Sequence, residues 1–272
     1  MVKYRMQYIA SFSGGKDSVA MVLKLIELNY PLDRVAFIDT GLEFGEQINV
    51  IKICERRFKE LKPGLKFDWI RPEKTFEEQF YTKIKKGKNK GKIYGWPYTT
   101  AFNSWCNDRL KIRPFKKYMK QFKEETVIYL GIAADEPSRL KKLQANRKAP
   151  LAELGMTEKD CLKYIKEKGF NNPMYWKFER LGCYLCPKQK LDSLKSLRRH
   201  YPDLWKKMLI MDADSPKTFR ADGTTLAELE QKFRNEEDYE YFNLVEAKLF
   251  YGWSKALRKF IGEDIMLKRY CY

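Results

Sequence analysis

Short apolar runs alternate along this chain with longer segments in which apolar residues recur every three or four positions. The short runs are rich in β-branched and aromatic residues and predict strands at 5–12, 35–38, 67–70 and 127–130. The longer segments predict helices at 17–29, 44–61 and 108–124. Such alternation is typical of a parallel sheet covered by helices on both faces, with ligands at the carboxyl ends of the strands. The sequence therefore predicts an α/β fold.

The strand pattern fades after Pro150 and helical patterns take over. Thr157 begins one predicted helix with a capping motif, and the periodicity stays helical from Leu191 onward. Two further helices, rich in aromatic and basic residues, are predicted within residues 226–260. We therefore expect a ligand-binding α/β domain over residues 1–150 and a mainly helical C-terminal region over residues 151–272.

A lysine-rich segment, residues 83–92, interrupts the alternation of strands and helices. Six of its ten residues are lysines and two are glycines, which predicts a mobile, exposed loop. A solvated tip without function and a flap that grasps substrate both agree with this composition.

The balance of charges narrows the choice of partners. The chain carries 54 Lys and Arg residues against 36 Asp and Glu residues, a formal net charge of +18. So large an excess attracts polyanions, and nucleic acid is the first candidate. Part of the charge could instead bind a small anionic nucleotide or serve solubility, and charge alone does not separate these roles.

Membrane insertion and secretion are not expected. No apolar run approaches the ~20 residues of a membrane span, and the first residues lead directly into the first predicted strand, without room for a signal peptide. We therefore expect a cytoplasmic protein with no membrane partner. In that compartment the six cysteines are expected to be ligands, nucleophiles or core residues rather than disulfides.

A glycine pair stands between the first predicted strand and the first predicted helix. Glycines let the backbone approach a ligand closely, and the start of a helix presents unpaired N–H groups that attract anions. A lysine adds a full charge and two serines add hydroxyls. The segment therefore predicts a phosphate cradle, and its candidate ligands are Ser11, Ser13, Gly14, Gly15, Lys16, Asp17 and Ser18.

This cradle departs from the usual loop of nucleoside triphosphatases. That loop has an additional upstream glycine, and a Ser or Thr directly after its lysine. Here Ala10 and Asp17 occupy those places. The string Ser-Gly-Gly-Lys-Asp-Ser instead resembles the pyrophosphate loop (PP-loop) of the ATP-pyrophosphatase superfamily, in which chemistry occurs at the α-phosphate of an adenine nucleotide.

Four other segments strengthen the resemblance and narrow it to one family. They are residues 39–44, 105–111, 131–139 and 180–187. Together with the cradle they resemble the phosphoadenosine phosphosulfate (PAPS) reductase family over roughly residues 8–205. The resemblance implies a Rossmann-like parallel sheet, the PP-loop fold, that binds ATP or an adenylyl nucleotide in the first domain. The family also includes enzymes that move sulfur by other means, among them DNA phosphorothioation proteins.

The segment after the second predicted strand carries Asp39, Thr40 and Gly41. A turn at this place can offer backbone groups to adenine, and Asp39 can orient a ribose hydroxyl or a metal-bound water. Alternatively, Asp39 and Thr40 cap the helix that is predicted to begin near Phe44.

A later strand is followed by Gly131, Asp135, Ser138 and Arg139, which could close over the phosphates. Arg139 is the best candidate among them because a guanidinium binds phosphate bidentately. Family members often carry an arginine where this chain has Ala133, so the anionic group recognised on that side stays undetermined. Lys16, Asp17 and Arg139 are the candidate catalytic residues.

Three cysteines are candidate metal ligands. Cys183 and Cys186 form a Cys-x-x-Cys pair, and Cys106 lies far upstream beside Trp105. Three thiolates suggest a 4Fe–4S cluster with one open iron, which sulfur-transferring members of the superfamily can use to hold sulfide. Structural zinc and a redox dithiol are the alternatives.

A fourth ligand is not evident from the sequence. His200, Cys54, Cys161 or water could supply it. Each residue also has a plainer interpretation, because both cysteines lie in amphipathic helices as core residues and His200 precedes Tyr201-Pro202 at a predicted helix end.

Two reactions and one binding role fit these features. The favoured reaction is adenylation of an acceptor by ATP and Mg²⁺, and nucleic acid is the first candidate for this acceptor. Adenylation would be one step of a sulfur transfer that an iron–sulfur cluster assists. PAPS or adenylylsulfate reduction is the second; family reductases use a C-terminal cysteine, for which Cys271 stands at the right end but without the surrounding motif. The third is a non-catalytic nucleotide sensor or nucleic-acid-binding protein. Either enzyme could need a partner protein that supplies sulfur or electrons.

Overall fold

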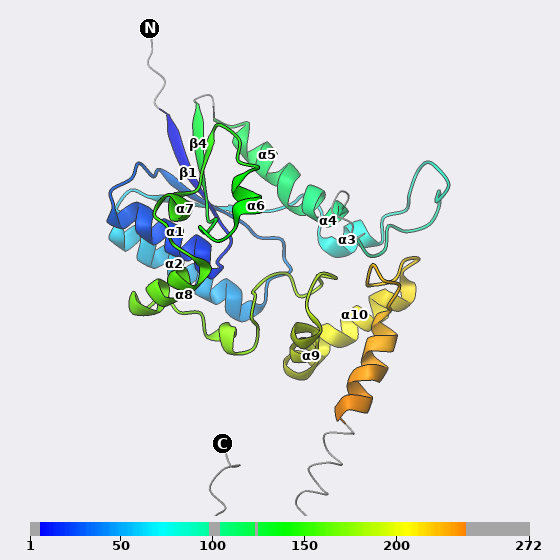
Figure 1. The fold of residues 1–272 in the computed structure, drawn as a ribbon. Helices are drawn as coiled ribbons and strands as arrows, with labels where there is room; N and C mark the ends of the chain where they lie inside the picture. Colours follow the sequence, from blue (N-terminus) through cyan, green and yellow to red (C-terminus); the bar gives the residue numbers. More distant parts are fainter. Residues whose placement is uncertain (1–5, 98–103, 123–124, 238–272) are drawn as a thin grey trace, which may run out of the picture. The chain divides into compact units, whose positions relative to one another are not determined.

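A five-stranded parallel sheet lies at the centre of the computed structural model (Figure 1). The structure describes residues 6–97, 104–122 and 125–237, which divide into two compact units between Gly223 and Thr224. All strand pairs are parallel, and the order across the sheet is β3-β2-β1-β4-β5. The strands are β1 (Gln7–Phe12), β2 (Arg34–Ile38), β3 (Lys66–Ile70), β4 (Thr126–Leu130) and β5 (Arg147–Lys148).

Alternate residues of the central strands face opposite layers, as the period of a strand requires. Ala10 and Phe12 point into the larger core. That core is covered by α1 (Lys16–Glu27), α2 (Gly45–Leu61), α7 (Pro150–Glu153) and α8 (Glu158–Glu167). Ile9 points to the other face, where α5 (Arg113–Met119) packs with Phe115. The predicted parallel sheet with helices on both faces is confirmed.

The helix predicted at 108–124 is present as a continuous helical stretch from Trp105 to Met119, but it contains a π-helical turn. The stretch consists of α4 (Trp105–Asn107), a π-helical turn η1 (Asp108–Ile112) and then α5, while residues 123–124 lie outside the described chain. Pro114 at the start of α5 has no N–H to donate to the carbonyl of Leu110. A widened turn before the proline is the physical result.

Shorter elements complete the first unit. They are α3 (Phe76–Phe80), α6 (Pro137–Leu140), a 3₁₀ helix η2 (Pro173–Trp176), α9 (Leu191–His200) and α10 (Pro202–Asp214). In the second unit residues 226–237 are helical, and Thr225 and Glu228 cap the start of this helix through reciprocal hydrogen bonds. Cys271 lies outside the described residues, and the domain boundary near residue 150 stays a prediction.

The carboxyl ends of three strands lie together at one edge of the sheet and position the site. The central strand β1 pairs with β2 through Phe12 and Phe37, and with β4 through Ser11 and Leu130. Because the order of strands reverses around β1, this edge is where α/β proteins bind their ligands. Among the described residues, no helix has the length and apolar content that a membrane crossing needs.

Candidate functional site

The loop Ser13-Gly14-Gly15 connects β1 to α1 and is locked against α2. Gly14 has a φ of +74°, and a Cβ atom added to it would lie 2.6 Å from Ile51 Cγ1. The Gln47 side chain donates a hydrogen bond of 3.0 Å to the Gly14 carbonyl. Any other residue at position 14 would therefore be strained and would clash, which explains on steric grounds why glycine occupies it.

The two serine hydroxyls of the loop bond mainly to the loop itself. Ser18 Oγ donates to the Gly15 carbonyl at 2.9 Å and accepts from the Ser13 N–H at 3.2 Å. Ser13 Oγ lies 3.2 Å from Ser18 Oγ. Ser11 lies inside β1, before the loop. These contacts fix the shape of the loop at the start of α1.

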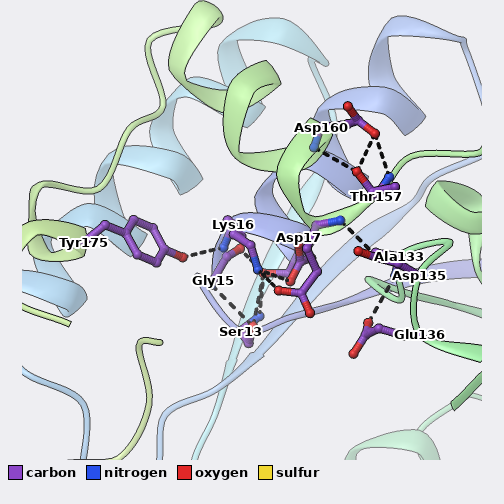
Figure 2. A network of polar contacts seen from close by, with 12 residues as sticks. Ser13, Gly15, Lys16, Asp17, Ala133, Asp135, Glu136, Thr157, Asp160 and Tyr175 are labelled. Atoms are coloured by element: carbon purple, nitrogen blue, oxygen red, sulfur yellow. Dashed lines mark hydrogen bonds and ion pairs between the residues drawn. The ribbon is translucent and has the colours of Figure 1, made fainter. Parts of the chain in front are cut away.

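Lys16 presents two donors, and both are engaged by residues from distant parts of the chain (Figure 2). Its backbone N–H donates to the Tyr175 hydroxyl at 2.7 Å. Its ammonium group contacts Glu158 and lies 3.2 Å from Asp17 Oδ2. Burial opposes the lysine charge, but the hydrogen bond to Glu158 and the charge of Asp17 outweigh burial and raise the pKa of Lys16. A phenol and a carboxylate thus bind the groups that the cradle would offer to a phosphate.

Asp17 lies beside Lys16 with one oxygen unused. Asp17 Oδ1 is buried and has no hydrogen-bond partner among the described residues. Burial raises the pKa of this carboxyl, with Glu158 and Glu136 adding to the effect. Mg²⁺ is commonly held by one or two carboxylates together with substrate phosphates, and Asp17 fits that role. The described chain holds no group of three or more acidic, His or Cys side chains placed to bind a metal.

The segment after β4 supports the cradle by close packing. A Cβ at Gly131 would lie 3.0 Å from the Ser18 backbone nitrogen, so α1 and β4 approach as closely as only glycine permits. Asp135 accepts a hydrogen bond of 3.1 Å from the Glu158 N–H. Arg139 is paired with Glu136 at 2.8 Å, and Ser138 is exposed. Contact of Ser138 and Arg139 with a phosphate stays a prediction.

In the segment after β2, Asp39 pairs with Arg71, whereas Thr40 lies beside Cys183. Asp39 accepts hydrogen bonds from the Gly41 N–H at 3.1 Å and from Arg71 Nε at 3.0 Å. Thr40 is buried, donates to Glu43 at 2.9 Å and lies 3.8 Å from Cys183 Sγ. Helix α2 begins without a side-chain cap, so Asp39 and Thr40 do not cap it.

Cys106, Cys183 and Cys186 all line one cavity of about 660 Å³, which we call the thiol cavity. Cys106 comes from α4 and the other two from the loop before α9. Thr40 and Lys111 line the same cavity. The structure therefore brings together three residues that are up to 80 positions apart in the sequence.

The chemistry of the thiol cavity fits a thiolate-bound metal centre. Three sulfur donors lining one cavity are the donor set of an iron–sulfur cluster or a zinc site. Burial raises the pKa of Cys183 to about 11 and also raises that of Cys186, so a metal would displace their protons. Lys111 also lines the cavity, and its pKa is raised, with the charge of Cys183 as the largest cause. The donor set is suitable, although the three sulfurs are not preset in a ligating arrangement.

The loop that carries Cys183 and Cys186 is held by contacts that sequence reasoning missed. The Gln189 side chain donates to the carbonyls of Cys183 at 3.2 Å and Tyr184 at 2.8 Å. Arg220 donates to the Gln189 carbonyl at 2.8 Å. The Tyr184 N–H also pairs with the Leu42 carbonyl at 3.0 Å, which joins this loop to the segment after β2.

The candidate fourth ligands lie away from the thiol cavity. Cys54 and Cys161 are 1% and 0% exposed in the core, where burial raises the pKa of each to about 12. His200 ends α9 and packs against Trp176 with a ring-centroid distance of 5.1 Å. None of these three residues lines the cavity, so of the predicted candidates only water remains.

Proteins of known sequence give three relatives. Two uncharacterized proteins of Methanocaldococcus jannaschii are 31% and 30% identical over 217 and 213 residues, which cover 75% and 72% of this chain. The chain spans less than half of each, 41% and 45%. An uncharacterized nin region protein of Escherichia phage lambda is 29% identical over 272 residues, with 89% of this chain and 90% of that protein covered.

Two solved structures show distant likeness. PAPS reductase from Candida auris in a phosphate complex has a TM-score of 0.44 and 13% identity, covering 67% of this chain and 83% of that one. The U34-tRNA thiolase NcsA from Methanococcus maripaludis with its 4Fe–4S cluster has a TM-score of 0.40 and 16% identity, covering 74% and 68%.

A family model described as phosphoadenosine phosphosulfate reductase domain matches residues 7–189. The match begins with β1, includes the cradle and ends just after the Cys-x-x-Cys pair, so it contains all three cysteines of the thiol cavity. The chain therefore belongs to the phosphoadenosine phosphosulfate reductase domain family.

Proposed function

We propose that this chain binds ATP or an adenylyl nucleotide at the cradle and adenylates an acceptor as one step of sulfur transfer. Nucleic acid is the first candidate for the acceptor. One observation supports the proposal: the cradle and a lining residue of the three-thiol cavity follow neighbouring strands at the same edge of the sheet. The cradle follows β1, and Thr40, which lines the thiol cavity, follows the neighbouring strand β2. A nucleotide and a sulfur-handling centre would thus be neighbours.

The cradle residues account for the chemistry at the nucleotide. The Lys16 amide and ammonium would exchange Tyr175 and Glu158 for the β- and γ-phosphates. An acceptor oxygen then attacks the α-phosphorus, the bond from that phosphorus to the bridging oxygen breaks, and pyrophosphate leaves. The acceptor proton passes to water. Asp17 would hold Mg²⁺ together with the phosphates, and Lys16 and this ion would offset the charge that develops on the leaving group.

The thiol cavity supplies the second part of the proposal. Cys106, Cys183 and Cys186 would hold a 4Fe–4S cluster, which with three protein thiolates can keep one iron free for sulfide. Lys111 would offset part of the negative charge of the thiolates. Zinc at the same three thiols is the alternative for this centre.

The charge of the chain supports nucleic acid as the acceptor. A net charge of +18 exceeds what one nucleotide needs for its neutralisation. The reduction of PAPS or adenylylsulfate is the second candidate, and membership of the family favours it.

An assay with α-labelled ATP tests the proposal. Adenylation predicts pyrophosphate release together with transfer of labelled AMP to a nucleic acid. A reductase would instead leave ATP unchanged and form sulfite from a sulfonucleotide when given a thiol reductant. If neither product forms, catalysis is refuted and the chain is a nucleotide-binding protein.

A further inference from the structure

We infer that residues 82–94, which we call the lysine hairpin, form the docking surface for the phosphate backbone of a single-stranded nucleic acid, one unit of which enters the thiol cavity. The choice of nucleic acid rests on the proposed function. Docking itself requires no turnover, so the two ideas can be tested apart.

Backbone hydrogen bonds within the lysine hairpin join its two arms. Lys83 and Ile93 form an antiparallel bridge, and the Ile84 N–H donates to the Lys92 carbonyl at 2.8 Å. Gly87 and Gly91 have φ values of +84° and +86°, which let the chain reverse. The segment leaves α3 and extends away from the sheet before it returns (Figure 1). The predicted exposure of the lysines is confirmed, and these hydrogen bonds shape the loop that carries them.

The charge of this scaffold is not balanced locally. No acidic residue occurs between positions 81 and 97. The six lysines are all exposed, and none makes an ion pair with a described residue. Six cations on a short hairpin repel one another, and a polyanion removes that repulsion when it binds.

The base of the lysine hairpin is bonded to the wall of the thiol cavity. Arg109 Nη2 donates to the Tyr94 hydroxyl at 2.9 Å, and Trp105 Nε1 donates to the Gly95 carbonyl at 3.2 Å. Arg109 and Trp105 both line the cavity. A chain held along the lysines therefore arrives at the thiols.

The cavity selects the form of the polyanion. A volume of about 660 Å³ suits one small-molecule-sized unit, such as an unstacked nucleotide, and excludes a duplex. Lys111 and Lys188 line the cavity and continue the positive charge inward. The hairpin exposes no large apolar side chain from residue 82 to residue 94, so it lacks the groups that insert into a membrane.

Charge neutralisation tests the docking surface. One variant changes four lysines of the hairpin to glutamine: Lys85, Lys86, Lys88 and Lys90. The matched control changes four exposed lysines on α2, β3 and α8: Lys52, Lys66, Lys163 and Lys166. Binding of a labelled 20-nucleotide single-stranded RNA, and of DNA of the same sequence, is titrated from 50 to 250 mM KCl, with melting curves to check folding.

The expected result is a loss confined to the hairpin variant. Each phosphate contact contributes about −0.7 to the slope of log affinity against log salt for a single strand, so loss of four contacts should make the negative slope about 3 units less steep. Affinity at 50 mM KCl should fall at least tenfold, and the control should bind like the wild type. Tighter binding of one of the two strands shows whether the docking surface is built for RNA or for DNA.

Two outcomes would overturn the inference. A hairpin variant with wild-type affinity and slope would remove the docking surface, whether or not ATP is turned over. Displacement of the RNA by polyglutamate at an equal concentration of charges would reassign the hairpin to an acidic protein. If the hairpin binds RNA but no pyrophosphate is released, docking stands and adenylation fails.

Discussion

At the scale of single residues, the Tyr175 hydroxyl occupies a backbone donor that the proposed function assigns to a phosphate. The Tyr175 hydroxyl accepts the Lys16 N–H at 2.7 Å, at the start of α1 where a phosphate oxygen is expected to bind. Tyr175→Phe removes this acceptor and keeps the ring, so a nucleotide no longer has to displace it. One neutral hydrogen bond contributes about 1 kcal/mol, and we expect ATP to bind about fivefold more tightly in isothermal titration. Weaker binding would show that the hydroxyl contacts the nucleotide itself.

Lys16 itself should be indispensable for turnover. Lys16→Met keeps much of the side-chain length but removes the charge that stabilises pyrophosphate, and loss of one such group lowers rates by roughly 10²–10³-fold. Lys24→Met is the matched control, because Lys24 lies on the same helix and pairs with Glu27. Pyrophosphate release measures the effect. Equal rates in the two variants would remove the cradle from the mechanism.

At the scale of elements, periodicity predicted the sheet well because its strands carry apolar, β-prone runs. β5 escaped prediction because it consists of only Arg147 and Lys148, without any apolar signal. The π-helical turn before Pro114 was also not predicted, since a proline shows that one backbone hydrogen bond is missing but not how the helix adapts to the loss.

Contacts between elements left no pattern in the sequence. Tyr175 reaches Lys16 across 159 positions, and Gln189 holds the Cys-x-x-Cys loop through its side-chain amide. Motifs therefore located the cradle and the cysteines, whereas the residues that position them became evident only from the structure.

A prediction about the metal centre concerns the loop that carries Cys183. Cys183→Ser, purified without oxygen, should lose most of the bound iron and the visible iron–sulfur absorbance, because one of three ligands is lost. Cys54→Ala, a change in the core away from the cavity, should keep both. Metal and sulfide analysis gives the readout. If the wild-type protein contained one zinc per chain and no sulfide, the metal centre would be assigned as zinc and not as an iron–sulfur cluster.

At the largest scale, the two proposed binding surfaces, the cradle and the lysine hairpin, differ in their electrostatics. The cradle is partly buried, and its lysine already has acidic neighbours, so its interactions are short-ranged. The lysine hairpin is exposed and without acidic neighbours in sequence. Salt screens exposed charges more strongly than partly buried ones, and this difference would separate the two proposed binding events.

The last prediction uses that separation in the wild-type protein. With about four phosphate contacts, nucleic-acid affinity should fall with a log–log salt slope near −3. ATP affinity, held by hydrogen bonds from the loop and by Lys16, should fall much less over the same range of KCl. Pyrophosphate release driven by a nucleic-acid acceptor should therefore decline with salt through the KM of the acceptor, while kcat changes little. Steady-state rates at several salt concentrations measure this, and a parallel decline in ATP affinity would show that both ligands depend on the same exposed charges.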